Sequence, residues 1–308
     1  MVALGGAIAD VVPATRWRQL QPLRAGFVHL SSGDAAWPEL WSMIATRTPE
    51  APPQWLLLDV PGTPQAGVTL RQMFAQARWF GLFEGTEWHA LHEQGPVLVD
   101  LRTCPALADL CIVDGQRWPG LLMASEAGAA SLLVHLRRML TVTLGLHRAL
   151  LSYYNPTTAS YFFDACDAVE LSRWLGPIHQ LRWFGGSWAD RAMGCEGWQR
   201  LSNPGLSVSP LAVEESLSVG QQGKLQTCLL EQHAWRWNRS TGVDFPRLWA
   251  HVQEGIALGF SERPVLDGWI WLRLQYPDAA PVQPLPGGTQ QERLDHLRNL
   301  WQNDPPWP

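Results

Sequence analysis

The chain has 308 residues, of which 46% are hydrophobic and 17% are charged, a composition that favours a packed globular core over disorder. Its formal net charge is −5, and its 23 basic residues include a single lysine, Lys224. Because binding to a nucleic-acid backbone needs clustered positive charge, nucleic acid is excluded as an expected partner. The outlier is tryptophan, with 18 residues, a type that enriches both cores and protein interfaces.

Cysteine usage and the absence of long apolar runs predict a soluble, cytoplasmic protein. The five cysteines are scattered without Cys-x-x-Cys spacing, as expected for reduced thiols. The N-terminal stretch lacks a basic region and contains Asp10, so a signal peptide is not expected. No apolar run approaches the roughly 20 residues that span a bilayer, and membrane insertion is therefore not expected.

The first half of the chain predicts buried strands joined by loops and one helix. Residues 1–54 are rich in proline and weakly patterned, and are expected to form a loop that leads into a strand at 55–60 (WLLLDV). Further strands are predicted at 95–101 (GPVLVDL) and 120–125 (GLLMAS). Between them, the stretch 70–80 has helical spacing, carried by Leu70, Phe74, Ala77 and Trp79 or Phe80.

A second helix and a hairpin follow. In the stretch 127–140, Leu132, Leu133, Leu136 and Leu140 fall on one helical face while Arg137 and Arg138 point away from it. The next residues, TVTLGLHRALLSYY, predict a hairpin of two strands.

The hairpin ends at an aromatic corner, LLSYYNPTTASYFF, which contains Tyr153, Tyr154, Asn155 and Pro156. Asparagine followed by proline is a strong helix start, because the Asn side chain accepts an N–H from Thr157 or Thr158 and proline at the first position needs no donor. Aspartate would cap such a helix as well as asparagine does.

The helix that begins at this corner should turn Tyr161, Phe162 and Ala165 inward. A second helix should end at Gly176 and Pro177, before a returning strand, IHQLRWF. We therefore interpret the corner as a structural element and not as a reactive one.

The pattern becomes helical past a glycine- and proline-rich connection. The sequence predicts an α/β domain over 1–205, with a mixed or mainly antiparallel sheet and flanking helices, and a helical C-terminal lobe over 206–308. Within the lobe, helices are indicated by FPRLWAHVQEGIALGF and RLDHLRNLW, separated by a proline-rich linker at 278–288.

No catalytic, metal-binding or cofactor-binding constellation is recognisable. Ser187 lies in GGSWA, where Ala189 replaces the second glycine of a nucleophile elbow. His89 and His92 are not spaced to bind zinc from one helix face. Cys166 is followed by Asp167, whose charge would raise and not lower a thiol pKa. No cofactor and no enzymatic activity are expected.

A resemblance to a known family rests on HLRRMLTV and LLSYYNPTTASYFFDACDAVELSRWLGPIHQLRW, preceded in the same order by WLLLDV and GLFEGTEWHALHEQGPVLVDL. This segment, about residues 55–184, resembles the adaptor or Tap-type chaperone family of bacterial type VI secretion. Members commonly show Arg-x-Tyr-Asp-Pro-Arg at the corner, where this chain has Ser152, Asn155 and Thr157 at the charged positions.

The resemblance implies a non-enzymatic protein that binds a toxic effector in the cytoplasm and delivers it to the VgrG spike. Two alternatives stay open: an immunity protein that blocks a cognate toxin, and a hydrolase that uses Ser187 or a cysteine.

The tail carries aromatic residues in excess, interleaved with arginines, and aromatic and arginine side chains are the usual anchors of protein interfaces. The sequence therefore predicts partner binding at Trp235, Trp237, Arg239, Trp249, Trp269, Trp271 and Arg273. Trp269 and Trp271 cannot share one helix face, so one of them should be exposed or lie at an interface. The alternative is that these rings seal the lobe onto the α/β domain.

Overall fold

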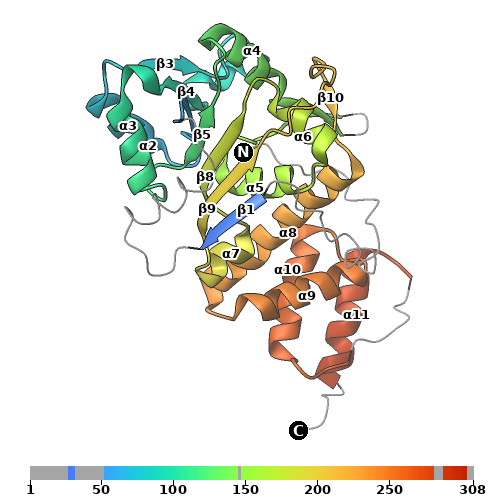
Figure 1. Cartoon of the computed structure of the whole chain (residues 1–308). Helices are drawn as coiled ribbons and strands as arrows, with labels where there is room; N and C mark the ends of the chain where they lie inside the picture. Colours follow the sequence, from blue (N-terminus) through green and yellow to red (C-terminus); the bar gives the residue numbers. More distant parts are fainter. Residues whose placement is uncertain (1–26, 32–51, 145–146, 281–286, 304–308) are drawn as a thin grey trace. The chain divides into compact units, whose positions relative to one another are not determined.

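The computed structural model describes residues 27–31, 52–144, 147–280 and 287–303. The chain divides into two compact units. One unit, which we call the α/β unit, contains the described residues up to Leu229, and the helical lobe contains those from Leu230 onward (Figure 1). The predicted fold class, a mixed α/β region followed by a helical lobe, is confirmed.

A seven-stranded sheet organises the α/β unit, and all its neighbouring strands are antiparallel. Its strands, in spatial order, are β1 (Phe27–Ser31), β9 (Gly197–Ser202), β8 (Gln180–Gly185), β5 (Gly120–Ala124), β2 (Trp55–Leu58), β4 (Val97–Asp100) and β3 (Arg78–Gly81). The strands predicted around 55–60, 95–101 and 120–125 are confirmed, as is the strand IHQLRWF.

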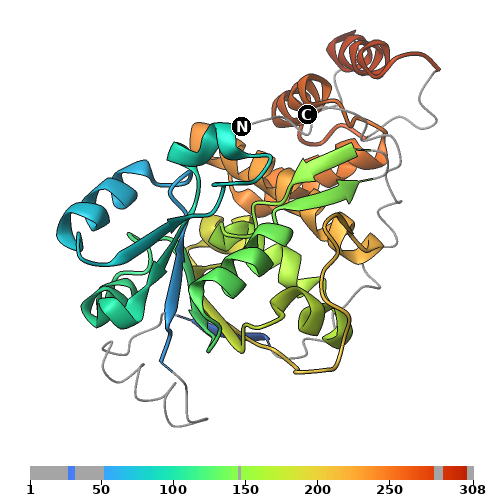
Figure 2. The ribbon, with the colours of Figure 1, turned by 90° about the horizontal axis from the view of Figure 1, so that it is seen from above.

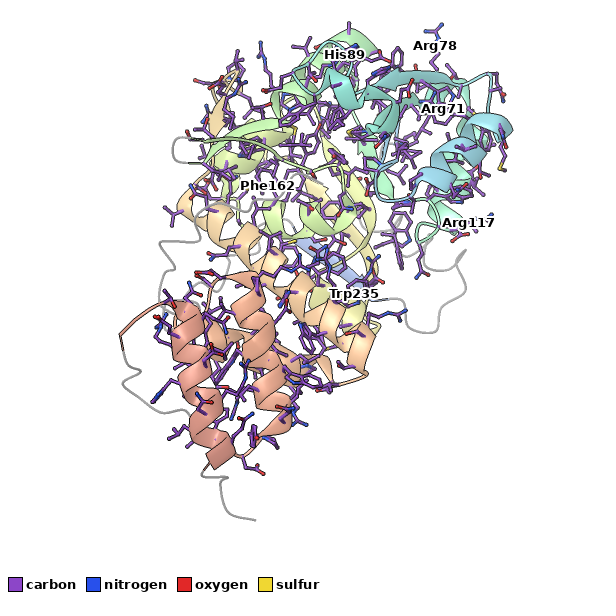
Figure 3. All side chains as sticks on the ribbon, turned by 180° about the vertical axis from the view of Figure 1, so that it is seen from behind. Arg71, Arg78, His89, Arg117, Phe162 and Trp235 are labelled. Atoms are coloured by element: carbon purple, nitrogen blue, oxygen red, sulfur yellow. The ribbon has the colours of Figure 1, made fainter. Side chains whose placement is uncertain are left out.

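Alternating side chains of β2 supply both faces of this sheet, because successive residues of a strand point to opposite sides. Trp55 and Leu57 join one buried cluster, and Leu56 and Leu58 join another. Helices α2 and α3 cover the second cluster, and α4, α5 and α6 cover the first (Figure 2). Their bounds are α2 Pro64–Met73, α3 Pro105–Val113, α4 Ala129–Arg138, α5 Pro156–Asp164 and α6 Ala168–Leu175. Phe162 lies in this interior, whereas Arg71, Arg78 and Arg117 are exposed (Figure 3).

The helix predicted over 70–80 is wrong in its second half. Helix α2 ends at Met73, and Trp79 and Phe80 belong to β3, paired with Val99 and Leu98 of β4. Pairing with a buried neighbouring strand outweighs the helical spacing of the apolar residues, a long-range effect that a local pattern does not contain. Within the stretch 1–54, expected to be a loop, 27–31 is strand β1; the other residues up to 51 lie outside the described residues.

The predicted hairpin is confirmed as β6 (Thr141–Leu144) and β7 (His147–Leu150). It belongs to a second sheet of three strands, ordered β10-β6-β7, in which β10 (Glu215–Ser216) runs parallel to β6. The mixed pairing expected of the sheet is thus found in this small sheet, and the large sheet is antiparallel.

The two units divide inside helix α8 (Val219–Thr241), between Leu229 and Leu230, whereas the sequence placed a boundary near residue 205. The glycine- and proline-rich stretch past 202 resembles a linker, yet it leads to Leu211 and Leu217, which are buried in the α/β core. The first half of α8 also binds this unit, since Lys224 Nζ lies 2.6 Å from Asp164 Oδ2.

The helical lobe consists of the second half of α8 with α9 (Phe245–Ala257), α10 (Arg263–Gln275) and α11 (Gln290–Asn303). Its core includes Trp269, whose ring contacts those of Phe260 and Trp301. The linker predicted at 278–288 lies partly outside the described residues. No helix in the described part of the chain is long and apolar enough to cross a membrane.

Candidate partner-binding surface

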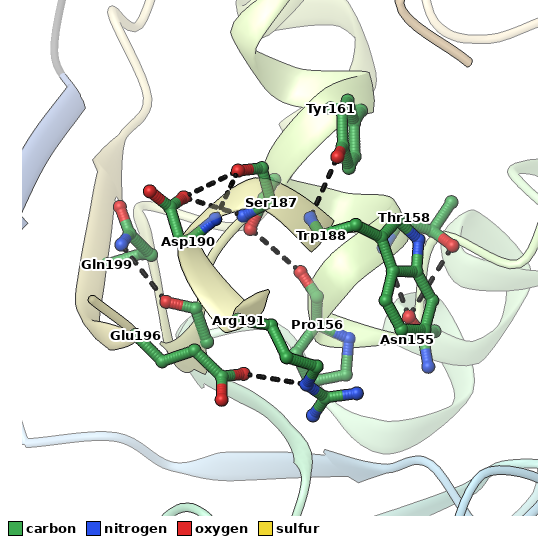
Figure 4. Close-up of polar contacts among 12 residues, drawn as sticks. Asn155, Pro156, Thr158, Tyr161, Ser187, Trp188, Asp190, Arg191, Glu196 and Gln199 are labelled. Carbon is green, nitrogen blue, oxygen red and sulfur yellow. Dashed lines mark hydrogen bonds and ion pairs between the residues drawn. The ribbon is translucent and has the colours of Figure 1, made fainter. Parts of the chain in front are cut away.

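The aromatic corner is built around a helix cap, as the sequence predicted. Asn155 Oδ1 accepts the N–H of Thr158 at 3.0 Å, and Pro156 is the first residue of α5 (Figure 4). The helix buries Tyr161 and Phe162, so its apolar side faces the core.

Asn155 also has a partner that the sequence did not reveal. Its Nδ2 donates to Asp59 Oδ2 at 2.7 Å, while the other carboxylate oxygen of Asp59 accepts the N–H of Gly62 at 3.1 Å. Asp59 is 2% exposed, and burial raises the pKa of this carboxyl despite both hydrogen bonds. The bond joins residues 96 positions apart, a separation for which a single sequence has no local signal.

The two tyrosines before the cap are core residues. Tyr153 donates from its hydroxyl to the carbonyl of Leu136 at 2.8 Å and is 1% exposed. Burial raises the pKa of Tyr154 to about 12. The rings meet edge to face, with centroids 6.0 Å apart. Both phenols are therefore neutral over the physiological pH range, and their contribution is packing.

The turn after α6 also depends on close packing. Gly176 has a φ of +51°, and a Cβ at this position would collide with the ring of His135. His135 Nε2 lies 2.9 Å from the carbonyl of Trp174, and burial lowers the pKa of this histidine. The carbonyl of Pro177 accepts the hydroxyl of Ser125 at 2.7 Å. Tyr153, Tyr154, Asn155, Pro156, Gly176 and Pro177, predicted as a structural motif, thus have structural surroundings at the corner and at the turn after α6.

Ser187 is engaged as a helix cap. Its Oγ accepts the N–H of Asp190 at 3.0 Å, and Asp190 Oδ2 lies 2.8 Å from both the hydroxyl and the main-chain N of Ser187 (Figure 4). The reciprocal bonds form a capping box at the start of α7 (Trp188–Met193). The next N–H, of Trp188, donates to the hydroxyl of Tyr161 at 2.8 Å.

Cys166, His89 and His92, the other residues of reactive type, also have ordinary structural surroundings. Cys166 Sγ lies 3.1 Å from Gln221 Nε2 and 3.4 Å from the carbonyl of Phe162, and burial raises its pKa. His89 and His92 are exposed and stacked, with ring centroids 4.8 Å apart. Among the described residues, no group of three or more histidine, cysteine, aspartate and glutamate side chains is placed to hold a metal ion.

Helix α10 presents its two tryptophans to opposite surroundings, as their spacing predicted. Trp269 is fully buried, and its Nε1 donates to the carbonyl of His251 at 2.8 Å. Trp271 is 54% exposed. The expectation that one of the two rings is exposed is confirmed.

Arg273, predicted as a partner-binding residue, is engaged inside the lobe. Its Nε lies 2.9 Å from Glu254 Oε2, and its side chain is 11% exposed. The guanidinium carbon lies 5.7 Å from the ring centroid of Trp269 and 5.8 Å from that of Trp301. The same group donates to the carbonyls of Tyr276 and Ala279, which follow the end of α10. Arg273 thus has a structural role inside the lobe, and partner binding by this residue stays a prediction.

Trp237 binds a carboxylate on α10, the helix that also carries Trp271. Trp237 Nε1 donates to Asp267 Oδ1 at 2.7 Å, and His233 Nε2 lies 3.1 Å from the same oxygen. Burial opposes ionisation of Asp267, but the hydrogen bonds from His233 and Trp237 outweigh it and lower the pKa of this carboxyl. Trp271 follows Asp267 by four residues on α10, so the two side chains are neighbours on one helix face. We call Trp237, Asp267 and Trp271 the aromatic seam.

The remaining predicted partner-binding residues differ in exposure. Arg239 is exposed near the end of α8, and Trp235 and Trp249 are partly buried. Partner binding by these residues stays a prediction.

Comparison with known proteins adds one finding. A family model described as "Domain of unknown function (DUF4123)" matches residues 54–173. The match shows that this segment is similar to that family. The matched segment begins just before β2 and ends in α6, so it includes the aromatic corner and the helices on both faces of the large sheet, while the helical lobe lies outside it. No curated protein and no solved structure matches the chain.

Proposed function

We propose that the protein is a non-enzymatic adaptor that binds an effector toxin in the cytoplasm and loads it onto the VgrG spike of a bacterial type VI secretion system. The observation that carries this proposal is the match to the DUF4123 family at 54–173, because the same segment carries the motifs that resemble the Tap-type adaptors. The family description itself states no function.

The surroundings of the reactive side chains support a binding role. The hydroxyl of Ser187 is used in a helix cap, and the Cys166 thiol has a raised pKa, which disfavours the thiolate needed for attack. We expect that replacing Ser187, Cys166 or His92 singly with alanine leaves delivery of the effector unchanged. Loss of delivery in a correctly folded variant would favour the hydrolase alternative.

The aromatic seam is the surface that we assign to the effector. Trp271 is half exposed, and Asp267, one helical turn before it, binds the indole of Trp237. An exposed tryptophan has the features of an interface anchor, which contributes most when a partner excludes water from it. Assignment of the matched segment to the spike and of the helical lobe to the effector gives the adaptor two separate binding surfaces.

Co-purification tests this division. The full chain should retain both the effector and the spike protein encoded beside it. Trp271→Ala should weaken effector binding by about tenfold or more, as the loss of an interface anchor does, and leave spike binding unchanged. Leu300→Ala, on the exposed side of α11, is the matched control and should leave both affinities unchanged. Equal effector binding by the wild type and Trp271→Ala would contradict the assignment.

A further inference from the structure

Strand β7 is an edge of the three-stranded sheet. Among the described residues, the order β10-β6-β7 gives β7 one neighbour, β6, and the register pairs Val142 with Ala149 and Thr143 with Arg148. An edge strand directs the N–H and C=O groups of alternate residues away from its sheet.

The register identifies which groups these are. Leu151 N donates to Leu140 O at 2.7 Å, so the pair Leu140 and Leu151 is a hydrogen-bonded one. Because hydrogen-bonded pairs alternate along an antiparallel ladder, Val142 and Ala149 form the next such pair. The main-chain groups of Arg148 and Leu150 therefore point outward, and no hydrogen bond within the described part of the chain engages them.

Strand β3, an edge of the large sheet, differs from β7 because one of its outward main-chain groups is bonded. There, the carbonyl of Gly81 accepts from Arg137 Nη2 at 3.0 Å, so a side chain from α4 covers the edge. The side chain of Arg148 gives β7 no such cover, because its Nη2 lies 2.9 Å from Glu87 Oε1 and its Nε lies 3.2 Å from Glu214 Oε1.

Charge decides between the possible occupants of this edge. Two carboxylates surround one guanidinium, which leaves an excess of negative charge beside β7. A second copy of the chain that paired through the same edge would bring the same excess, so self-pairing is electrostatically disfavoured. A basic segment would be attracted instead.

We infer that β7 is a strand-addition site for an extended, basic segment of a partner protein. The added strand forms hydrogen bonds with the main-chain groups of Arg148 and Leu150. Its residue beside Arg148 lies near Glu87 and Glu214, which favours lysine or arginine there. Ala149 and Leu150 both pack against the core cluster, so the residues beside these two positions favour apolar side chains.

The test uses the full-length protein and a phage-displayed library of random 12-residue peptides, so it requires neither the effector nor the spike. Selected peptides should combine a basic residue with β-branched or aromatic residues, and should protect the amides of Arg148 and Leu150 from hydrogen exchange. Leu150→Pro should weaken peptide binding at least tenfold, because proline removes an outward N–H without removing a bond between β6 and β7.

Leu150→Ala is the matched control, since it shortens the same side chain and keeps the N–H. Thermal melts of both variants verify folding, and protection of the two amides in the wild type tests the inference without any variant. Equal peptide affinity of Leu150→Pro and Leu150→Ala, failure to select any peptide, or a dimer whose interface protects these amides would each overturn the inference. Failure of the effector to bind would refute the proposed function alone.

Discussion

At the scale of single residues, Asn155 shows how one side chain can satisfy two parts of the fold. Its oxygen caps α5, and its Nδ2 group donates to the buried carboxylate of Asp59. The capping role follows from the Asn-Pro pair, whereas the second bond uses the amide group of Asn155 as a hydrogen-bond donor. This bond argues against the expectation that aspartate would serve equally well at this position, because two carboxylates would then face each other in the interior.

We predict that Asn155→Asp lowers the free energy of unfolding by about 2–3 kcal/mol at pH 7, as expected for a buried carboxylate that loses its donor. Part of the loss should be recovered near pH 4.5, because the introduced carboxyl, once protonated, can again donate to Asp59. Urea unfolding at both pH values measures the effect. Asp167→Asn, at the exposed cap of α6, is the control and should change stability by much less. Equal losses in the two variants would contradict the role of Asp59.

Asp59 itself should make stability depend on pH. Because its folded pKa is raised, the folded protein holds the proton more tightly than the unfolded chain does, and stability is lost as the pH rises through the folded pKa. Asp59→Asn removes this titration. The free energy of unfolding of the variant should therefore fall less than that of the wild type as the pH rises from about 4 to 7. Parallel profiles would contradict the prediction, and Asp278→Asn, at an exposed position, controls for the loss of one charge.

Gly176 and Gly85 allow the backbone strain of a positive φ to be separated from the steric clash of an added Cβ. Both have positive φ, but a Cβ at Gly176 meets the His135 ring, and a Cβ at Gly85 meets nothing within 4 Å. Gly85→Ala should cost about 1 kcal/mol, the backbone term alone. Gly176→Ala should cost clearly more, as measured by chemical unfolding. A Gly176→Ala variant no less stable than Gly85→Ala would show that His135 moves aside without cost.

At the scale of elements, α10 distinguishes a core face from an interface face. Trp269→Ala should destabilise the protein by about 3–5 kcal/mol, because it removes a fully buried ring. Trp271→Ala should change the free energy of unfolding by about 0.5 kcal/mol or less. Thermal and urea unfolding of the two variants measures the contrast, and a large loss for Trp271→Ala would place that ring in the fold instead of at an interface.

Local patterns predicted those elements whose causes are local. The Asn155-Pro156 start, the Gly176-Pro177 stop and the opposite faces of Trp269 and Trp271 depend on neighbouring residues, and all three were predictable. Strand β3 and the Asp59 bond depend on partners distant in sequence, and the sequence missed both. For Arg273, the aromatic neighbours on the chain were visible, but nothing local showed that the group lies between buried rings.

At the scale of the whole molecule, the position of the division between the units has a measurable consequence. A chain that ends at residue 205 lacks the buried Leu211 and Leu217, as well as the ion pair of Glu215 with Arg173, 2.8 Å apart. Each buried leucine contributes about 1.5–3 kcal/mol. Residues 1–229 should therefore melt at a higher temperature than residues 1–205, by circular dichroism. Equal melting temperatures would support the boundary predicted near 205.

The contact between Lys224 and Asp164 can be followed by chemical labelling of Lys224. Since Lys224 is the only lysine in the chain, a reagent that acylates amines modifies no other side chain amine. Its ammonium group is held 2.6 Å from a carboxylate of α5, so its rate of acylation reports whether the start of α8 is attached to the α/β unit. Mass spectrometry of one peptide could therefore follow the attachment of this helix while the protein binds its partners, without any engineered label.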